Sequence, residues 1–300
     1  MKPTQQPPTS PRLRLFDCFT FFNEFELLEV RLNELSPLVS YFVIAEAPIT
    51  FQGKEKPLYF LENRQRFAKF ADRIRHVVVN DMPVGSREAD HWRREHHQRN
   101  ALANAIADAA PDDYVMLSDV DEIPRASVVR SILDQNAGGP IIHLLELAMF
   151  RFFLNFREPK PWLRNGPRLT RRRYVNSFQA LRNTRPPAAD PINSFRRWLS
   201  ASMQLARPIR RNVVHDAGWH FSSLGGAEAY AEKLRSFSHI EPERRTLPDN
   251  AMVGVAARRI GEALKQGPGK TVPVDGSFPA FIVDHVEQFQ SLIYPAAGSR

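Results

Sequence analysis

The sequence contains a single cysteine, Cys18, which excludes an intramolecular disulfide and a zinc site built from several cysteines. No apolar run approaches the ~20 residues that a membrane-spanning helix needs. Residues 1–14 are polar and proline-rich, unlike the charged and then apolar start of a secretory signal. Internal repeats are also missing. These features predict a cytoplasmic protein that makes at most a peripheral contact with the inner face of a membrane.

The composition favours one sizeable core and an anionic partner. The chain has 300 residues, of which 43% are hydrophobic, and a net charge of +8. Arginine is concentrated in residues 168–211, which suits phosphorylated substrates, anionic lipid or nucleic acid. A GC-rich coding sequence would also give many arginines. No nucleic-acid-reading module accompanies these arginines, so nucleic acid is not expected as a partner.

Apolar patterns of strand and helix alternate from residue 13 onward, after a proline-rich stretch at 1–12 that reads as a disordered tail. Strands are expected at 14–22, 41–45, 74–79 and 114–117, and helices at 24–35, 63–70 and 86–109. This order predicts an α/β fold with a mostly parallel sheet and helices on both faces. We expect one domain over residues 13–290, with an irregular arginine- and proline-rich insertion at about 182–212.

The chain is organised around an acidic segment, Ser118-Asp119-Val120-Asp121-Glu122-Ile123-Pro124, which follows the fourth predicted strand. Ligands of open α/β sheets bind at the carboxyl ends of the strands. Because side chains alternate along extended chain, Asp119 and Asp121 can face one side together. Two carboxylates of this kind suit Mg²⁺ or Mn²⁺, which protein carboxylates share with substrate phosphates. Alternatively, both residues cap a helix that begins near Pro124.

Two further segments carry polar groups that need partners. The helix at 86–109 places Trp92, His96 and Arg99 on one face with apolar residues. Arg99 there would pair with the acidic segment or with a substrate phosphate, or else extend its charged end to solvent. Later in the chain, Asp216 and His220 lie within a short glycine-containing segment, where they are either functional or turn-forming.

Taken together, several motifs resemble glycosyltransferase family 17. They are residues 17–35, 41–47, 50–54 and 98–100, the acidic segment at 118–124, and Gly218-Trp219-His220-Phe221-Ser222. The resemblance covers roughly residues 13–290 and lapses at 182–212. It implies a GT-A-like, Rossmann-like nucleotide-sugar-binding domain, a UDP-sugar donor such as UDP-N-acetylglucosamine, Mn²⁺ or Mg²⁺, and inversion at the anomeric carbon. The acceptor it implies is a glycan or glycolipid.

The resemblance also suggests roles for individual residues. Asp119, Asp121 and His220 are the expected metal ligands. Asp216, because it lies close to His220 in the sequence, and Glu122 of the acidic segment are the candidate catalytic carboxylates. The expected substrate-binding residues are Asn23, Glu24, Glu46, Arg99, Asn100 and Trp219.

Other interpretations stay open from the sequence. The same acidic pair would serve a metal-dependent phosphohydrolase or nucleotidyltransferase. A non-catalytic nucleotide-sugar-binding protein is a third possibility, because fold does not determine function. Residues 182–212 interleave aromatic residues with arginines, so this stretch is a closing loop, an acceptor or anionic-membrane contact, or disordered chain.

Overall fold

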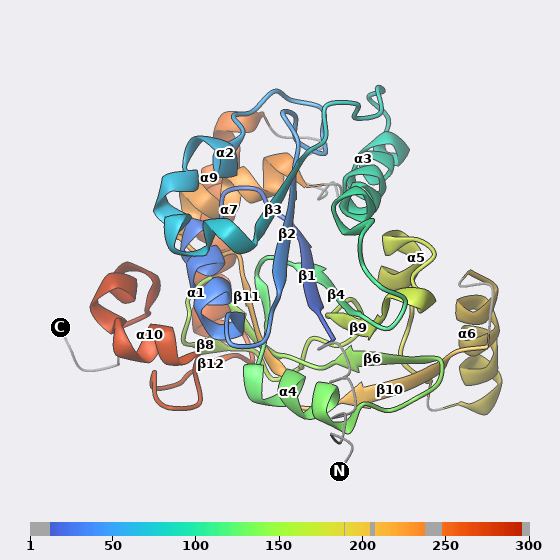
Figure 1. Cartoon of the computed structure of the whole chain (residues 1–300). Coiled ribbons are helices and arrows are strands. Elements are labelled where there is room, and N and C mark those ends of the chain that lie inside the picture. Colours follow the sequence, from blue (N-terminus) through green and yellow to red (C-terminus); the bar gives the residue numbers. More distant parts are fainter. Residues whose placement is uncertain (1–12, 189, 205–207, 238–247, 296–300) are drawn as a thin grey trace, which may run out of the picture.

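The computed structural model describes residues 13–188, 190–204, 208–237 and 248–295, so the predicted disordered tail at 1–12 lies outside it (Figure 1). A seven-stranded sheet has the order β10-β6-β9-β4-β1-β2-β3. Its strands are β1 (Leu15–Thr20), β2 (Tyr41–Glu46), β3 (Ile74–Val78), β4 (Tyr114–Asp119), β6 (Ile141–Leu145), β9 (Arg168–Arg171) and β10 (Arg210–Val214).

The prediction of a mostly parallel sheet is confirmed. Strands β1, β2, β3 and β4 pair in parallel, as do β6 and β10. Only β9 runs against its neighbours, β4 and β6. The carboxyl ends of the four consecutive parallel strands therefore meet at one edge, where β1 ends at Thr20 and β4 at Asp119.

A second sheet of five strands has the order β12-β8-β7-β11-β5. It contains β5 (Glu122–Pro124), β7 (Ala148–Arg151), β8 (Phe156–Arg157), β11 (Gly218–Ser222) and β12 (Lys270–Thr271). Strand β11 pairs in parallel with β7 and antiparallel with β5. Because β5 follows β4 after a turn at Val120 and Asp121, this second sheet begins where the acidic segment ends.

Helices cover both faces of the large sheet (Figure 1). One face packs against α1 (Phe25–Leu35), the short α2 (Tyr59–Glu62) with the 3₁₀ segment η1 (Arg64–Arg73), and α4 (Ala126–Gln135). The other face packs against the 3₁₀ segment η2 (Leu102–Ile106), which continues α3 (Glu88–Ala101), and against α5 (Phe178–Arg182). The amphipathic spacing of the apolar residues of α1, such as Leu28, Leu32 and Leu35, explains why this helix buries one face.

The remaining helices lie outside these two layers. Helix α7 (Gly226–Ser236) packs against α9 (Met252–Gln266) around a small core of its own. The others are η3 (Arg172–Tyr174), α6 (Pro191–Gln204), η4 (Asp249–Ala251), α10 (Ala280–Asp284) and η5 (Val286–Leu292). Among the described residues, no helix is both long enough and apolar enough to span a bilayer.

Three local expectations were wrong. Pro124 ends β5 and does not start a helix, since β5 pairs with β11 and α4 begins only at Ala126. Residues 182–212 are more regular than an irregular insertion with only a short helix at 194–205, since they hold α6 and the first residues of β10. In α3 the buried face includes Asp90, His91, Arg94 and Gln98 besides Arg99, while Trp92, expected on the inward face, stays exposed.

Candidate functional site

A cavity of about 220 Å³ lies at the carboxyl edge of the parallel strands, beside the acidic segment. It is walled by the loop after β1, the start of β5, strand β11 and helices α3 and α7. Six of the residues predicted to be functional line it, and they come from four separate parts of the chain: Glu24, Arg99, Asp119, Asp121, Glu122 and His220.

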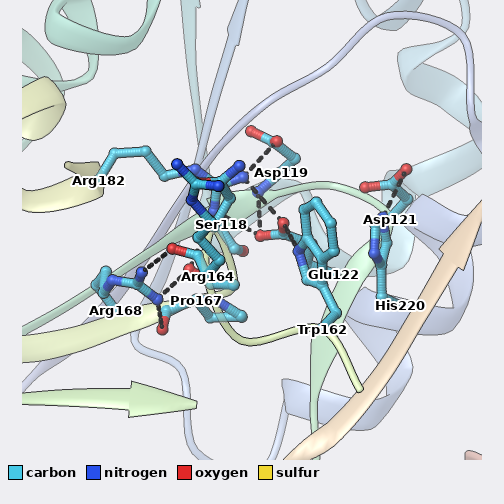
Figure 2. Close-up of polar contacts among 12 residues, drawn as sticks. Ser118, Asp119, Asp121, Glu122, Trp162, Arg164, Pro167, Arg168, Arg182 and His220 are labelled. Atoms are coloured by element: carbon cyan, nitrogen blue, oxygen red, sulfur yellow. Dashed lines mark hydrogen bonds and ion pairs between the residues drawn. The ribbon is translucent and has the colours of Figure 1, made fainter. Parts of the chain in front are cut away.

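Asp119 is held by two arginines at the end of β4. Its Oδ2 lies 2.6 Å from Arg182 Nη2 (Figure 2). Its Oδ1 lies 3.4 Å from Arg99 Nη2. Burial alone would raise the pKa of Asp119, but Arg182 and Arg99 outweigh it and hold that pKa below its usual range. Asp119 is therefore an ionised carboxylate whose two oxygens already have cationic partners.

Glu122 is buried and fully hydrogen-bonded. Arg182 donates to both carboxylate oxygens, at 2.7 and 2.9 Å, and the indole N–H of Trp162 donates to Oε1 at 2.6 Å (Figure 2). The backbone N–H of Asp119 donates to Oε2 at 3.1 Å. Donors occupy both oxygens of Glu122, which holds the turn that carries Asp119 in place, and its expected catalytic role stays a prediction.

Asp121 faces a different pair of groups. Its Oδ2 lies 3.5 Å from His220 Nε2 and 3.0 Å from Lys233 Nζ. Burial would raise the pKa of Asp121, but Lys233 and His220 outweigh it and hold the pKa well below its usual range. The ammonium of Lys233 comes from α7 and keeps a raised pKa, since Asp121 and Glu24 outweigh the effect of its burial. Lys233 is therefore a permanent positive charge in the cavity.

Backbone pairing between β5 and β11 brings His220 to the acidic segment. His220 pairs with Glu122, and Gly218 pairs with Pro124. Gly218 has φ of +144°, and a Cβ there would lie 2.2 Å from the carbonyl oxygen of Ile123. Only glycine can adopt this conformation at so close an approach, so Gly218 allows the two strands to meet.

Arg31 of α1 holds the acidic segment in place through hydrogen bonds from the core. It is completely buried and forms a two-pronged ion pair with the equally buried Asp17 of β1, at 2.8 and 2.5 Å. Its other donors reach Ser118 Oγ at 2.7 Å and the backbone carbonyl oxygens of Glu122 and Asp119 at 2.7 and 3.2 Å. One guanidinium thus fixes the turn between β4 and β5 to the core.

Glu24 is the remaining predicted carboxylate in the cavity. Its Oε2 accepts weakly from the backbone N–H groups of Phe22 and Asn23, at 3.3 and 3.1 Å. Burial raises the pKa of Glu24 above its usual range, against the lowering effect of Lys233. Unlike Glu122, Glu24 has no arginine partner among the described residues, and it faces the cavity.

The structure does not bring the other predicted residues into the cavity. Asn23 lines a smaller neighbouring hollow. Glu46 is buried, accepts from the first backbone N–H groups of α2 and lies 2.8 Å from His76 Nε2. Asn100 binds the amino end of α5, and the Trp219 indole donates to the carbonyl of Ser277.

Asp216 is also outside the cavity. It is 80% exposed on the turn between β10 and β11, has φ of +49°, and lies 3.5 Å from Arg125. Aspartate tolerates the left-handed conformation that this turn requires, so the turn-forming interpretation explains it. Asp216 does not line the cavity that Asp119, Asp121 and His220 border, so its role as a base stays a prediction.

The sequence prediction missed four side chains that shape the site: Arg31, Trp162, Arg182 and Lys233. Arg31 did leave a signal, because it lies three residues after Leu28 and four before Leu35, on the apolar stripe of its helix. The other three reach the acidic segment by long-range packing, and no local pattern marks them.

Two of the three predicted metal ligands, Asp121 and His220, are adjacent, while Asp119 is engaged by arginines. Within residues 13–295, less the gaps named above, no three His, Cys, Asp or Glu side chains are grouped to hold an ion alone. Mg²⁺ and Mn²⁺ commonly take one or two protein ligands and complete their shell with substrate phosphates. The donor set therefore fits an ion that a diphosphate completes, provided Lys233 gives up its contact with Asp121.

Comparison with known proteins shows which family this chain matches. The model of glycosyltransferase family 17 matches residues 5–175, which include the acidic segment but not His220 or Lys233. The rat and human beta-1,4-mannosyl-glycoprotein 4-beta-N-acetylglucosaminyltransferases are each 31% identical to this chain over 154 residues. That stretch is 49% of this chain and 28% of either relative, so this chain spans well under two thirds of their length.

Among solved structures, a 4-diphosphocytidyl-2C-methyl-D-erythritol synthase superposes with a TM-score of 0.39 at 14% identity. The superposition covers 68% of this chain and 90% of that one. Glucosyl-3-phosphoglycerate synthase from Mycobacterium tuberculosis, solved with Mn²⁺ and UDP, gives a TM-score of 0.33 at 13% identity, over 94% of this chain and 98% of that one.

Proposed function

Because this chain belongs to glycosyltransferase family 17, we propose that it transfers N-acetylglucosamine from UDP-N-acetylglucosamine to a glycan or lipid-linked glycan, with inversion and with a divalent cation. The observation that carries the proposal is the pair Asp119 and Asp121 beside a cavity at the carboxyl edge of the sheet. The relatives named above carry N-acetylglucosaminyltransferase in their names, which supports this donor sugar.

The cation would be held by Asp121 and His220, with Asp119 reaching it through water. When bound, it would supply positive charge to the diphosphate as the bond to the sugar breaks. Lys233 and Arg99 line the same cavity and offer further positive charge to that leaving group. Arg31 and Glu122 hold the turn between β4 and β5 in place, so these charges are positioned before the donor arrives.

We assign the proton-accepting role to Glu24. In the transfer, an acceptor hydroxyl oxygen bonds to the anomeric carbon, the bond from that carbon to the diphosphate oxygen breaks, and UDP leaves. The hydroxyl proton passes to Glu24, whose raised pKa makes it a better base than the arginine-bound Asp119. Glu24 must be deprotonated to act, so transfer should fall as the pH drops through its raised pKa.

Replacement of Glu24 by glutamine tests this role. We expect the Glu24→Gln variant to lose about 100-fold in transfer rate, the lower end of general-base effects, and to lose the acidic limb of the pH profile. Its affinity for UDP-N-acetylglucosamine should stay within a few-fold of that of the wild type. Donor affinity is measured by calorimetry and transfer by UDP release. A variant that keeps the acidic limb would remove Glu24 from this role.

Donor binding is best tested by thermal shift with UDP-N-acetylglucosamine, in Mn²⁺ or in chelator. A ligand at 100 times its dissociation constant stabilises the folded state by about 2.7 kcal/mol. We expect this shift only with Mn²⁺, and expect Asp121→Asn to abolish it. Asp134→Asn, an exposed carboxylate of α4 outside the cavity, is the matched control. An unchanged shift in the Asp121 variant would contradict the proposed donor site.

Product analysis separates transfer from the rival chemistries. A transferase releases intact UDP and forms a new glycoside, whereas a phosphohydrolase or nucleotidyltransferase cleaves or forms a phosphate bond. Donor binding without any product over a broad acceptor panel would favour a non-catalytic binding protein.

A peripheral contact with anionic membrane is part of the proposal, and helix α6 supports it. Ile192, Phe195, Leu199 and Met203 recur on one face of α6 and are 42–72% exposed. Such a helix beside arginines suits the surface of an anionic bilayer. We expect sedimentation with phosphatidylglycerol vesicles to decrease in Phe195→Ser and not in Val84→Ser, an exposed apolar control elsewhere on the surface. Equal sedimentation of both variants would argue against a role for α6.

A further inference from the structure

A second cavity adjoins the proposed donor site. It has a volume of about 410 Å³ and shares Glu95, Arg99, Asp119, Trp162 and Phe237 with the first cavity. Its other walls come from α3, from α5 and from the segments next to β9. A molecule in this cavity would therefore contact the same Asp119 that borders the donor site, which is where an acceptor must lie.

The lining of this second cavity suits a sugar. Trp92 and Trp162 offer aromatic surface, and Asn165, Gln179 and Asn183 offer amide groups that both donate and accept. Ligand sites of this kind combine apolar surface with a few polar groups that fix orientation.

The arginines of this cavity differ in how they are paired. Arg99 and Arg182 already contact carboxylates, namely Glu95, Asp119 and Glu122. Arg185 donates only to neutral oxygens, the side-chain oxygen of Asn165 at 2.6 Å and the carbonyl of Arg164 at 3.1 Å. No carboxylate of the described chain lies within ion-pair distance of Arg185, although its side chain is half-buried.

Further positive charge surrounds Arg185. Arg211 donates to the Arg185 carbonyl at 3.2 Å, and Arg197 donates to the carbonyl of Pro186 at 3.1 Å. Burial lowers the pKa of Arg185, and the nearby Arg164, Arg182 and Arg197 lower it further. These guanidinium groups repel one another, so an anion beside Arg185 would be attracted without competing with a carboxylate partner of Arg185.

We propose that the second cavity binds the acceptor and that this acceptor carries an anionic group, a phosphate or a carboxylate, which Arg185 holds. The inference rests on the proposed transferase function and adds to it the charge of the acceptor. A neutral glycan would leave the half-buried Arg185 without a charged partner.

The test uses the full chain with simple sugars as probes. Binding of N-acetylglucosamine 1-phosphate, glucuronic acid and neutral N-acetylglucosamine is measured by calorimetry at low salt with UDP and Mn²⁺ present. We expect at least one anionic sugar to bind about tenfold more tightly than the neutral one, because charge-assisted hydrogen bonds are the stronger kind. The comparison of phosphate with carboxylate identifies the anionic group.

Arg185→Gln should remove this preference, and Arg130→Gln should keep it. Arg130 is an exposed residue of α4 outside both cavities, so the two variants change the net charge equally. Equal binding of anionic and neutral sugars, or equal loss in both variants, would overturn the proposal. Donor affinity is measured in parallel: if it is absent while the anion preference persists, the proposed transferase function fails and the anion site remains.

A lipid source of the anion is distinguished with vesicles. Phosphatidylcholine vesicles with and without phosphatidylglycerol are offered to the wild type and to Arg185→Gln. If the variant loses vesicle binding but keeps its preference for sugar phosphates, Arg185 contacts membrane headgroups, and its assignment to the acceptor is wrong. Loss of the sugar preference with vesicle binding unchanged supports the acceptor site.

Discussion

The molecule contains two groups of arginines that differ in their side-chain partners. Arg31 and Arg182 are buried beneath the acidic segment, and carboxylates neutralise both. Arg185 lines the second cavity and has Arg164 and Arg197 nearby, and in the described chain the side chains of Arg185 and Arg197 donate to neutral oxygens. Buried arginines that are paired hold other groups in place, whereas clustered arginines without carboxylates are available to a ligand.

The difference has a thermodynamic consequence. Loss of a paired arginine leaves a buried carboxylate without compensation, so the folded state is destabilised. Loss of a clustered arginine relieves repulsion between like charges, so the folded state should be unaffected or slightly stabilised. Variants of the two groups should therefore change stability in opposite directions.

The largest effect is expected for Arg31→Met. Removal of one partner of a buried ion pair typically costs about 3–5 kcal/mol, and here three further hydrogen bonds to the acidic segment are also lost. Burial raises the pKa of Asp17, and without Arg31 that pKa rises further. A carboxyl whose pKa is higher in the folded state than in the unfolded state stabilises the fold fully at a pH below its unfolded-state pKa. This stabilisation is lost as the pH rises through its folded-state pKa. The variant should therefore be more stable at pH 5 than at pH 8, measured by urea unfolding.

A second change separates the ion pair from the support of the turn. In Asp17→Asn with Arg31→Met, the stability should be partly restored and the pH dependence lost, while UDP-N-acetylglucosamine binding stays impaired because the turn is still unsupported. Full recovery of donor binding would show that Arg31 serves only to neutralise the charge of Asp17 and does not support the turn.

An intermediate effect is expected for Arg182→Met. It leaves Glu122 with the indole of Trp162 and the backbone N–H of Asp119, so about 1–3 kcal/mol of stability should be lost, as for a buried group that loses part of its hydrogen bonding. Donor affinity should decrease, since Asp119 loses its 2.6 Å partner. Thermal unfolding and calorimetry measure both. Unchanged stability would remove Arg182 from the paired group.

The smallest effect, and one of opposite sign, is expected for Arg164→Gln. Arg164 is exposed, and the variant removes one like charge from beside Arg185. The free energy of unfolding should change by less than about 0.5 kcal/mol, toward higher stability, and the change should shrink in high salt because exposed charges are screened. A loss of stability larger than this would show that Arg164 has a structural partner.

Local patterns were sufficient to predict the strands of the parallel sheet and the edge at which the site lies. Hydrophobic runs mark β1, β2 and β4, and the position of Asp119 and Asp121 after β4 follows from strand order alone. The sheet topology was predictable because successive strands alternate with helices.

Contacts between distant segments were not predictable in the same way. Lys233 reaches Asp121 across 112 residues of chain, and no pattern near Lys233 reports this contact. Asp216 and His220 looked equivalent in sequence, but the strand β11 places only His220 against the acidic segment. Pro124 looked like a helix start because the pairing of β5 with β11 is a long-range event.

Gly218 has a consequence for how this site can change over evolutionary time. Since the carbonyl of Ile123 occupies the position of any Cβ there, the separation between β5 and β11 is set by main-chain atoms alone. Substitutions elsewhere can exchange the cations around the two aspartates, yet they leave the spacing of Asp121 and His220 untouched. The side chains that line the second cavity can therefore vary without moving the strand pair that carries His220 to Asp121.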